Sequence, residues 1–165
     1  MCGSIGKSRR NMVEANGNVT DRDVQDIKAI IARQFGSLSW SPGTTGNWEA
    51  FASDFLAGAT LYPAARPPKA QSVDAFVERM QGLAKAGLST FREAVAGDPI
   101  VHVFGNVAVA VGVCEINENN ARFNRGVEMM LFVKDDGAWR IIAQAWDTES
   151  AARRIPQELL NTRAK

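Results

Sequence analysis

Three titratable side chains of this sequence have apolar neighbours and are the first candidates for acid–base chemistry: Asp54, His102 and Glu128. Asp54 lies next to Phe55 in a segment that we expect to be helical. Burial of a carboxylate in an apolar cavity raises its pKa, which would let Asp54 act as a general base. The alternative is a solvated helix position, because Asp54 lies away from the main apolar face of the expected helix.

His102 is the only histidine of the chain, and it alternates with Val101 and Val103 on an expected strand. An imidazole titrates near neutral pH, so a histidine that lines a pocket can serve as a general acid or base. A hydrogen-bonded structural role, or a place in an interface, is the alternative for a histidine on a strand. His102 has no acidic neighbour in sequence, so carboxylate-based and purely binding functions stay open beside imidazole catalysis.

Glu128 is expected to lie close to Gln144 and Trp146 on the neighbouring strand. Such a polar cluster could line a cavity or lie in a contact between two subunits. A buried glutamate needs a partner, which Arg140 or Arg92 could supply as an ion pair. The cluster therefore indicates either cavity chemistry by Glu128, with Gln144 and Trp146 as ligand-binding residues, or a structural role.

Aromatic residues near the expected loops are further candidates for ligand binding. Trp40 and Tyr62 flank loops at helix ends, where rings that carry one polar atom suit small organic ligands. Phe55 belongs to the aromatic face of the second expected helix and would meet the same pocket. Packing in the core is the equal alternative for these rings.

The scarcity of histidine and cysteine excludes several classes of site. A chain with one histidine and two cysteines, Cys2 and Cys114, cannot form a four-ligand structural zinc site or a site with two histidines, and it shows no disulfide framework. Cys114 lies in an apolar run, where burial raises the pKa of a thiol, so we expect a core residue rather than a nucleophile. We therefore predict no metal site and no cofactor.

The charge and hydropathy patterns narrow the partners and the location. A net charge of +1 over 165 residues gives no support for a surface that binds nucleic acid or an anionic membrane. The chain has no run of 18 apolar residues, and its N-terminus lacks the apolar segment of a signal peptide. We predict a cytoplasmic protein that binds neither nucleic acid nor membranes.

The spacing of apolar residues changes once along the chain, and this change predicts the fold class. Residues 1–19 lack periodicity and are expected to be a flexible tail, after which Thr20 is expected to cap the first helix. Residues 20–148 are expected to form one α+β domain, and residues 149–165 a C-terminal tail. In this domain three N-terminal helices pack on a strongly curved, mostly antiparallel sheet of four to six strands. The expected helices cover residues 20–38, 47–59 and 73–83, and Ser72 is expected to cap the third. The expected strands cover residues 89–104, with an interruption at 97–99, and residues 107–116, 122–134 and 138–147.

The turns give an expected register for the last two strands. With residues 135–137 as the turn, Leu131 lies opposite Ile141 on an apolar face that packs on the helices. The other face carries Glu128 and Gln144 together with a stripe of valines from the neighbouring strand. An apolar stripe is costly to leave in water, so we predict a homodimer through the sheet. A slip of one residue would exchange the two faces.

The order of the expected elements, helices followed by a meander of strands, resembles that of a known superfamily. Two runs of residues carry the same resemblance. Residues 137–146 read Gly-Ala-Trp-Arg-Ile-Ile-Ala-Gln-Ala-Trp and are similar to the final strand of the SnoaL-like and DUF4440-type members of the NTF2-like superfamily. Residues 48–59, which begin Trp-Glu-Ala-Phe, resemble the second helix of these proteins, and residues 23–27 resemble the start of their first. The resemblance covers about residues 20–148. It implies the NTF2-like or cystatin-like cone, with a pocket between sheet and helices and a dimer through the outer sheet face.

The resemblance is specific for the fold and leaves the activity open. Members of the superfamily include isomerases, cyclases, dehydratases and epoxide hydrolases, and also non-catalytic adaptors and oligomerisation domains. The chain departs from isomerase-like members because its only tyrosine, Tyr62, follows the second helix, and from cyclase-like members because Trp146 and Asp147 have no neighbouring histidine. We expect a protein that binds a small apolar organic molecule in the cone pocket, with cofactor-free acid–base chemistry of the isomerase, dehydratase or cyclase type. A non-catalytic ligand-binding or dimerisation module is the alternative.

Overall fold

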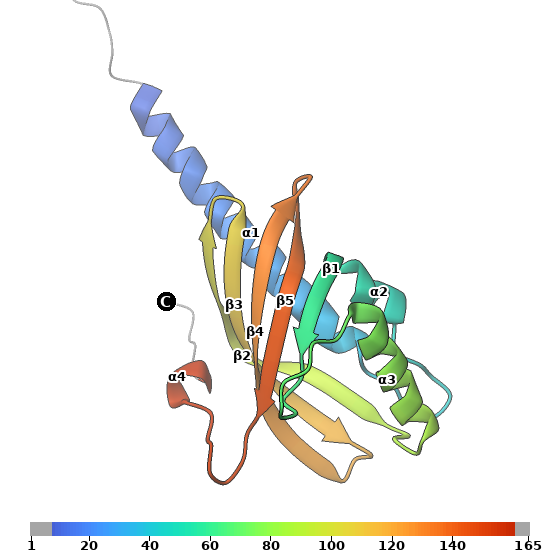
Figure 1. The fold of residues 1–165 in the computed structure, drawn as a ribbon. Coiled ribbons are helices and arrows are strands. Elements are labelled where there is room, and N and C mark those ends of the chain that lie inside the picture. The colour runs from blue at the N-terminus through green and yellow to red at the C-terminus, as the bar shows by residue number, and fades with distance from the viewer. Residues whose placement is uncertain (1–7, 161–165) are drawn as a thin grey trace, which may run out of the picture.

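The computed structural model describes residues 8–160, with side chains from residue 21 onward. Figure 1 shows one curved sheet of five strands, with α1 running along it and α2 and α3 near β1. The elements in chain order are α1 (Ser8–Ser37), α2 (Trp48–Ser53), β1 (Phe55–Tyr62), α3 (Val73–Lys85), β2 (Phe91–Phe104), β3 (Val107–Glu118), β4 (Arg122–Asp135), β5 (Ala138–Thr148) and α4 (Gln157–Leu160).

The apolar stripe of α1 packs on the sheet as predicted, with Ile27, Ile31 and Phe35 at its centre, all fully buried. Burial of each of these side chains contributes roughly 1.5–3 kcal/mol to the free energy of unfolding. The predicted start of the helix at Thr20 is wrong, because α1 begins at Ser8 and no proline stands before Thr20 to stop it. Residues 1–7 and 161–165, the ends of both predicted tails, lie outside the described residues.

The second predicted helix is only partly helical. Asn47 caps α2, since its side chain accepts a hydrogen bond from the Ala50 amide, but the helix ends at Ser53. The following residues form β1, which pairs in parallel with β5. β1 pairs with β5 at Phe55 and again from Thr60 to Tyr62, and this tertiary contact overrides the helical spacing of the aromatic residues. Phe55 therefore lies on a strand instead of a helix.

The third predicted helix is confirmed, and its cap is the predicted one. The Ser72 side chain accepts a hydrogen bond from the amide of Ala75 at 3.1 Å, which satisfies a donor at the first turn of α3. Phe76 and Met80 point into the core, one turn apart. α3 thus presents one apolar face to the inner side of the sheet.

The sheet has the order β1-β5-β4-β3-β2, and all its pairings except β1 with β5 are antiparallel. The predicted interruption of β2 is confirmed, because its register with β3 shifts between Ala96 and Ile100. Residues Asn119 and Asn120 both adopt positive φ in the turn between β3 and β4. The meander of four long strands is therefore the one that the sequence predicts.

The predicted register between β4 and β5 is wrong by one residue near the turn. Asp136 and Gly137 adopt φ angles of 46° and 77°, so they form a two-residue hairpin turn in which both central residues have positive φ. Phe132, and not Leu131, lies opposite Ile141, and a bulge follows at this point. As a result Glu128 and Phe132 face the helices, while Leu131 faces outward. The two faces of β4 are thus exchanged relative to the prediction.

The fold is α+β with a curved, mixed, five-stranded sheet. Within residues 8–160 the structure has four helices, of which only α1 and α3 have seven residues or more, so the prediction of three N-terminal helices is corrected. The core lies between the inner sheet face and these helices. None of the described helices is long and apolar enough to span a membrane.

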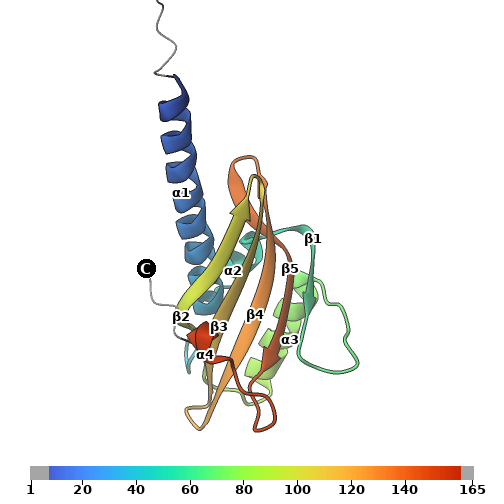
Figure 2. The ribbon, with the colours of Figure 1, turned by 90° about the vertical axis from the view of Figure 1, so that its left-hand side faces the viewer.

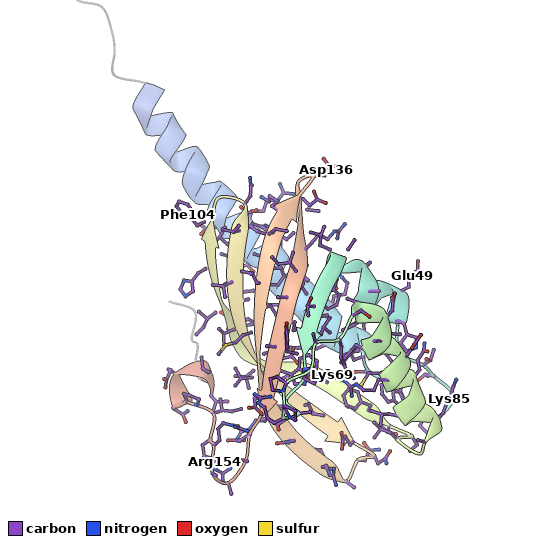
Figure 3. All side chains as sticks on the ribbon, in the orientation of Figure 1. Glu49, Lys69, Lys85, Phe104, Asp136 and Arg154 are labelled. Atoms are coloured by element: carbon purple, nitrogen blue, oxygen red, sulfur yellow. The ribbon has the colours of Figure 1, made fainter. Side chains whose placement is uncertain are left out.

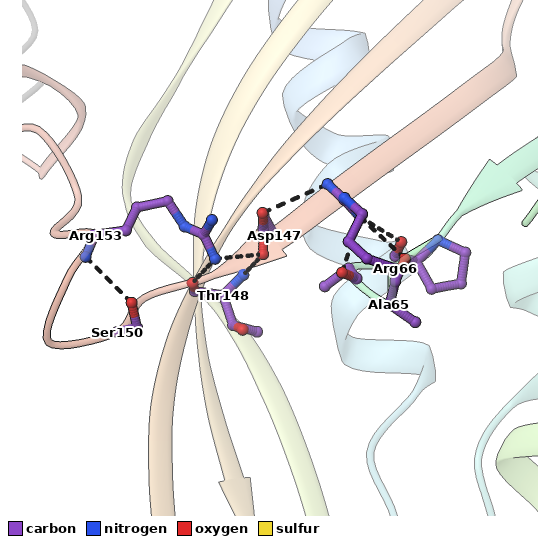
Figure 4. A network of polar contacts seen from close by, with 8 residues as sticks. Ala65, Arg66, Asp147, Thr148, Ser150 and Arg153 are labelled. Atoms are coloured by element: carbon purple, nitrogen blue, oxygen red, sulfur yellow. Dashed lines mark hydrogen bonds and ion pairs between the residues drawn. The ribbon is translucent and has the colours of Figure 1, made fainter. Parts of the chain in front are cut away.

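The segment after β5 is tied back to the body by charged groups. Asp147, at the end of β5, lies 3.0 Å from the Arg153 guanidinium and 3.6 Å from that of Arg66 in the loop between β1 and α3 (Figure 4). Figure 2 shows α4 beside β2 and β3. The close approach of Gly97 to the Leu160 carbonyl agrees with this position.

Candidate functional site

A cavity of about 170 Å³ lies between α2, α3 and the inner face of the sheet. Its aromatic wall is continuous: the Phe76 ring stacks on Phe51 at 5.1 Å and meets Trp146 edge-on at 5.7 Å. Arg79, on α3, lines the cavity at its solvent side (Figure 3 labels Lys85 at the end of the same helix). The apolar lining consists mainly of Leu38, Phe51, Phe76, Met80, Phe91 and Trp146.

Two carboxyl groups and a thiol meet on the inner sheet face beside this cavity. Glu93 of β2, Cys114 of β3 and Glu128 of β4 are all buried, and their functional atoms lie within 4.8 Å of one another. The register explains the meeting, because Glu93 lies opposite Ile116 and Glu128 lies opposite Gly112, one on each side of Cys114 along β3. Glu93 and Glu128 line the cavity.

The environment gives the two carboxyl groups different protonation states. Burial raises the pKa of Glu93 to about 7, although hydrogen bonds from Cys114 and Glu128 oppose this rise. The pKa of Glu128 is well above its usual range because of burial and the negative charge of Glu93. Burial also raises the pKa of Cys114, so its thiol keeps its proton. Near neutral pH, Glu128 is therefore a neutral acid that donates to Glu93, which ionises first.

Gln144 of β5 completes this polar group. Its side-chain nitrogen donates a hydrogen bond to Glu128, and its side chain is buried and lines the cavity. Its Oε1 atom has no hydrogen-bond partner among the described residues. A buried acceptor without a partner costs about 1–3 kcal/mol, so a donor group in the cavity would be bound favourably here.

The same three groups are close enough to hold one divalent cation. Binding would require the loss of the protons that Glu128 and Cys114 hold, both of which have raised pKa values. The raised pKa values therefore favour a carboxyl pair that shares a proton over a site that holds a cation. Such a pair is a general acid and a general base in one place.

Comparison with solved structures identifies the fold of this chain. No protein-family profile matches the chain, and no curated protein sequence matches it. An NTF2-like protein with a cystatin-like fold from Novosphingobium aromaticivorans superposes with a TM-score of 0.67 at 17% identity, over 94% of this chain and 99% of that one. The chain has the NTF2-like fold. A proposed scytalone dehydratase from the same organism gives a TM-score of 0.66 at 13% identity over 90% and 99% of the two chains.

A third solved structure supports the same conclusion. An NTF2-like protein of unknown function from Pseudomonas putida superposes with a TM-score of 0.63 at 10% identity, over 82% of this chain and 94% of that one. The predicted resemblance to the NTF2-like fold is thus confirmed. Kinship with the SnoaL-like and DUF4440-type members in particular stays a prediction.

Within the NTF2-like fold, Asp54 and His102 lie apart from Glu128. Asp54 follows α2, where its fully buried side chain forms an ion pair with Arg33 of α1. Burial raises the pKa of Asp54, while Arg33 acts in the opposite direction. His102 is exposed on β2 opposite Val109, on the outer sheet face. Of the three predicted catalytic residues, only Glu128 lines the cavity.

Of the predicted ligand-binding residues, some line the cavity and others lie beside it or on the surface. Gln144 and Trp146 line the cavity. Trp40 is buried beside it, stacked on Phe91 at 4.9 Å, and its indole N–H donates to the Leu88 carbonyl at 2.7 Å. Phe55 packs on Phe51, which belongs to the lining. Tyr62 is 42% exposed at the end of β1.

Glu93 is the residue that the sequence analysis missed. It stands between Phe91 and Val95 on β2, in phase with the apolar positions of that strand. A glutamate in phase with inward-facing residues is rare on the buried side of a strand, because an ionised carboxylate is costly to bury. This periodicity was the available signal for a functional carboxyl group.

Proposed function

We propose that the protein binds a small organic molecule in the inner cavity and performs cofactor-free acid–base chemistry on it, of the dehydratase or isomerase type. The observation that carries the proposal is the pair Glu93 and Glu128, two hydrogen-bonded carboxyl groups with separated pKa values that line an aromatic cavity. The free thiol of Cys114 beside the pair suits a reducing compartment, which favours the cytoplasm.

In the proposed dehydration, Glu93 is the base and Glu128 the acid. The Glu93 carboxylate removes a proton from a carbon next to the carbon that carries a hydroxyl group. The C–O bond breaks as Glu128 gives its proton to the departing hydroxyl, which leaves as water, and a C=C bond forms. The proton on Glu93 then returns to Glu128 through the hydrogen bond between them, and the pair is reset. In an isomerisation the same pair would remove and return a proton on one substrate.

The solved structures with the same fold lend the reaction class some support. A proposed dehydratase of the NTF2-like family from Streptomyces avermitilis superposes with a TM-score of 0.62 at 13% identity, over 80% of this chain and 99% of that one. The reaction class is taken from the carboxyl pair, and the name of that protein agrees with it.

The test measures the exchange of carbon-bound protons with solvent, because this exchange requires only the proposed base, Glu93. Cyclohexanone in D₂O serves as the probe, and NMR follows deuteration next to its carbonyl in the presence of protein. The Glu93→Gln variant is expected to lose about 100-fold or more of the catalysed exchange, since general bases contribute that much or more. Glu118→Gln is the matched control, because Glu118 lines the same cavity but is paired with Arg122.

Two outcomes would contradict the acid–base proposal. If Glu93→Gln exchanges as fast as the wild type, the pair is not the base. If the wild type binds cyclohexanone and related rings without any exchange, the non-catalytic ligand-binding module is the better description.

We also propose that the outer sheet face pairs with a second copy of the chain. Val109, Met129 and Leu131 are exposed there on adjacent strands, and Phe104 at the β2 end is 86% exposed. Exposed apolar area of this kind on a sheet marks an interaction surface. Light scattering after size exclusion is expected to give a dimer for the wild type and a monomer for Leu131→Glu. Tyr62→Glu, which adds the same charge elsewhere, should stay dimeric, and a monomeric wild type would contradict the proposal.

A further inference from the structure

The volume of the inner cavity suits a ligand with a single ring. A cavity of about 170 Å³ is only slightly larger than the engineered apolar cavity of ~150 Å³ that binds benzene. A six-membered ring with one or two small substituents fits such a space. Phe51, Phe76 and Trp146 line this space, and aromatic side chains pack well against such a ring.

The solvent side of the cavity carries a positive charge without a carboxylate partner. The Arg79 guanidinium carbon lies 5.0 Å from the centre of the buried Phe76 ring, so the charge lies over the aromatic wall. Among residues 21–160, Arg79 takes part in no ion pair. The other charged group of the rim, Glu118, is paired with Arg122. A planar guanidinium in this position suits a carboxylate, which it can bind with two parallel hydrogen bonds.

The buried end of the cavity requires a different group. Gln144 Oε1 is a buried acceptor without a partner within the described part of the chain, beside the Glu128 carboxyl to which Gln144 donates. A ligand hydroxyl can donate to this oxygen, and the same hydroxyl then lies next to the acid that would protonate it. The two ends of the cavity thus differ, with a cation at the solvent side and an acceptor next to an acid at the floor.

We propose that the cavity takes a monocyclic hydroxy acid, whose carboxylate binds Arg79 and whose hydroxyl binds Gln144. The proposal rests on the proposed function, because the hydroxyl at Gln144 is the group that leaves with the proton of Glu128. It specifies the substrate class that the carboxyl pair by itself leaves open. In this arrangement Arg79 and Gln144 are specificity-determining residues that fix the direction in which the ring enters.

The test compares three single-ring probes by isothermal titration calorimetry at about pH 6, where carboxylic acids of this type are ionised. The probes are 4-hydroxybenzoate, 4-hydroxybenzamide and benzoate. The wild type is expected to bind 4-hydroxybenzoate about tenfold more tightly than the amide, as one charge-assisted hydrogen-bond pair provides. Arg79→Met should bring the two affinities together, and Gln144→Leu should do the same for 4-hydroxybenzoate and benzoate.

The matched control is Lys85→Met, which removes the same charge from the end of α3 without touching the cavity (Lys85 is labelled in Figure 3). If Lys85→Met weakens carboxylate binding as much as Arg79→Met, the effect is long-range charge and the proposal is overturned. If the wild type binds the amide as well as the acid while cyclohexanone exchange still depends on Glu93, the hydroxy-acid proposal fails and the acid–base function stands. If none of the three probes binds, the hydroxy-acid proposal fails, and the cyclohexanone exchange alone then decides whether the acid–base function stands.

Discussion

The shared proton of Glu93 and Glu128 makes a sharp prediction about stability, because a displaced pKa changes the free energy of unfolding with pH. The pKa of Glu93 is raised from 4.5 to about 7. Below about pH 4.5 the carboxyl is protonated in the folded and the unfolded chain alike. Between 4.5 and 7 only the unfolded chain loses the proton, so the free energy of unfolding falls as pH rises.

The expected size of this fall follows from the displacement of the pKa. Each unit corresponds to ~1.4 kcal/mol, so the rise from 4.5 to about 7 amounts to about 3 kcal/mol. Glu128, whose pKa is higher still, acts in the same direction, and the observed titration belongs to the pair. The contribution is greatest below about pH 4.5 and is lost as pH rises through the pKa of the folded state.

The perturbation that tests this is Glu93→Gln, which keeps the shape of the side chain but has no proton to lose. Urea unfolding followed by tryptophan fluorescence gives the free energy of unfolding at several values between about pH 5 and 8. The variant is expected to gain about 3 kcal/mol relative to the wild type over this range, since it lacks the pH-dependent loss. Protein concentration is held constant, because dimer formation would also change the apparent stability.

The matched control for the pH experiment is again Glu118→Gln, which removes a carboxylate from the rim of the same cavity. Its side chain is 34% exposed and pairs with Arg122, so its profile should follow the wild type. A difference between wild type and Glu93→Gln that is constant from about pH 5 to 8 would refute the shared proton. The carboxyl pair would then be ionised in the folded chain, and the assignment of Glu128 as the acid would fall with it.

Three other substitutions have expected outcomes. Asp54→Asn should lower the free energy of unfolding by about 1.5–3 kcal/mol in urea titrations, because it removes a buried charged partner of Arg33. Gln34→Leu should raise the midpoint of thermal unfolding, since both polar atoms of this fully buried side chain have no hydrogen-bond partner within the described residues; a lower midpoint would indicate that the amide is satisfied. Cys114→Ala should retain the cyclohexanone exchange of the wild type, because a protonated thiol is no nucleophile, and complete loss of exchange would assign it a direct role.

The sequence predicted the meander and the helices that have strong periodicity, and it failed where a contact between distant residues decides the structure. α3 was predicted with its cap, because Ser72 and the spacing of Phe76 and Met80 are local signals. β1 was assigned to a helix, since the strand exists through its pairing with β5, more than eighty residues later along the chain. Local periodicity carries no information about such a partner.

In the candidate site, too, some features were predicted correctly from the sequence and others were not. Glu128 and Gln144 were expected to lie together, and they do, because both belong to adjacent strands with a short hairpin. Their face was predicted incorrectly, since two positive φ angles at Asp136 and Gly137 give a shorter turn than the three residues assumed. A change of one residue in a turn moves every side chain of the strand to the opposite face.

The small residues of β3 explain why two glutamates can meet on a buried surface. Ala110, Gly112 and Cys114 occupy buried positions on the inner face, and the register places Glu93 and Glu128 diagonally on either side of Cys114. A longer side chain at this central position would fill the space in which the carboxyl groups meet, and each would then be a lone buried acid without a partner. The alternation of valines with small residues, which from sequence suggested only an outward apolar stripe, therefore has a second consequence. It leaves the inner face open where the proposed acid and base need to share one proton.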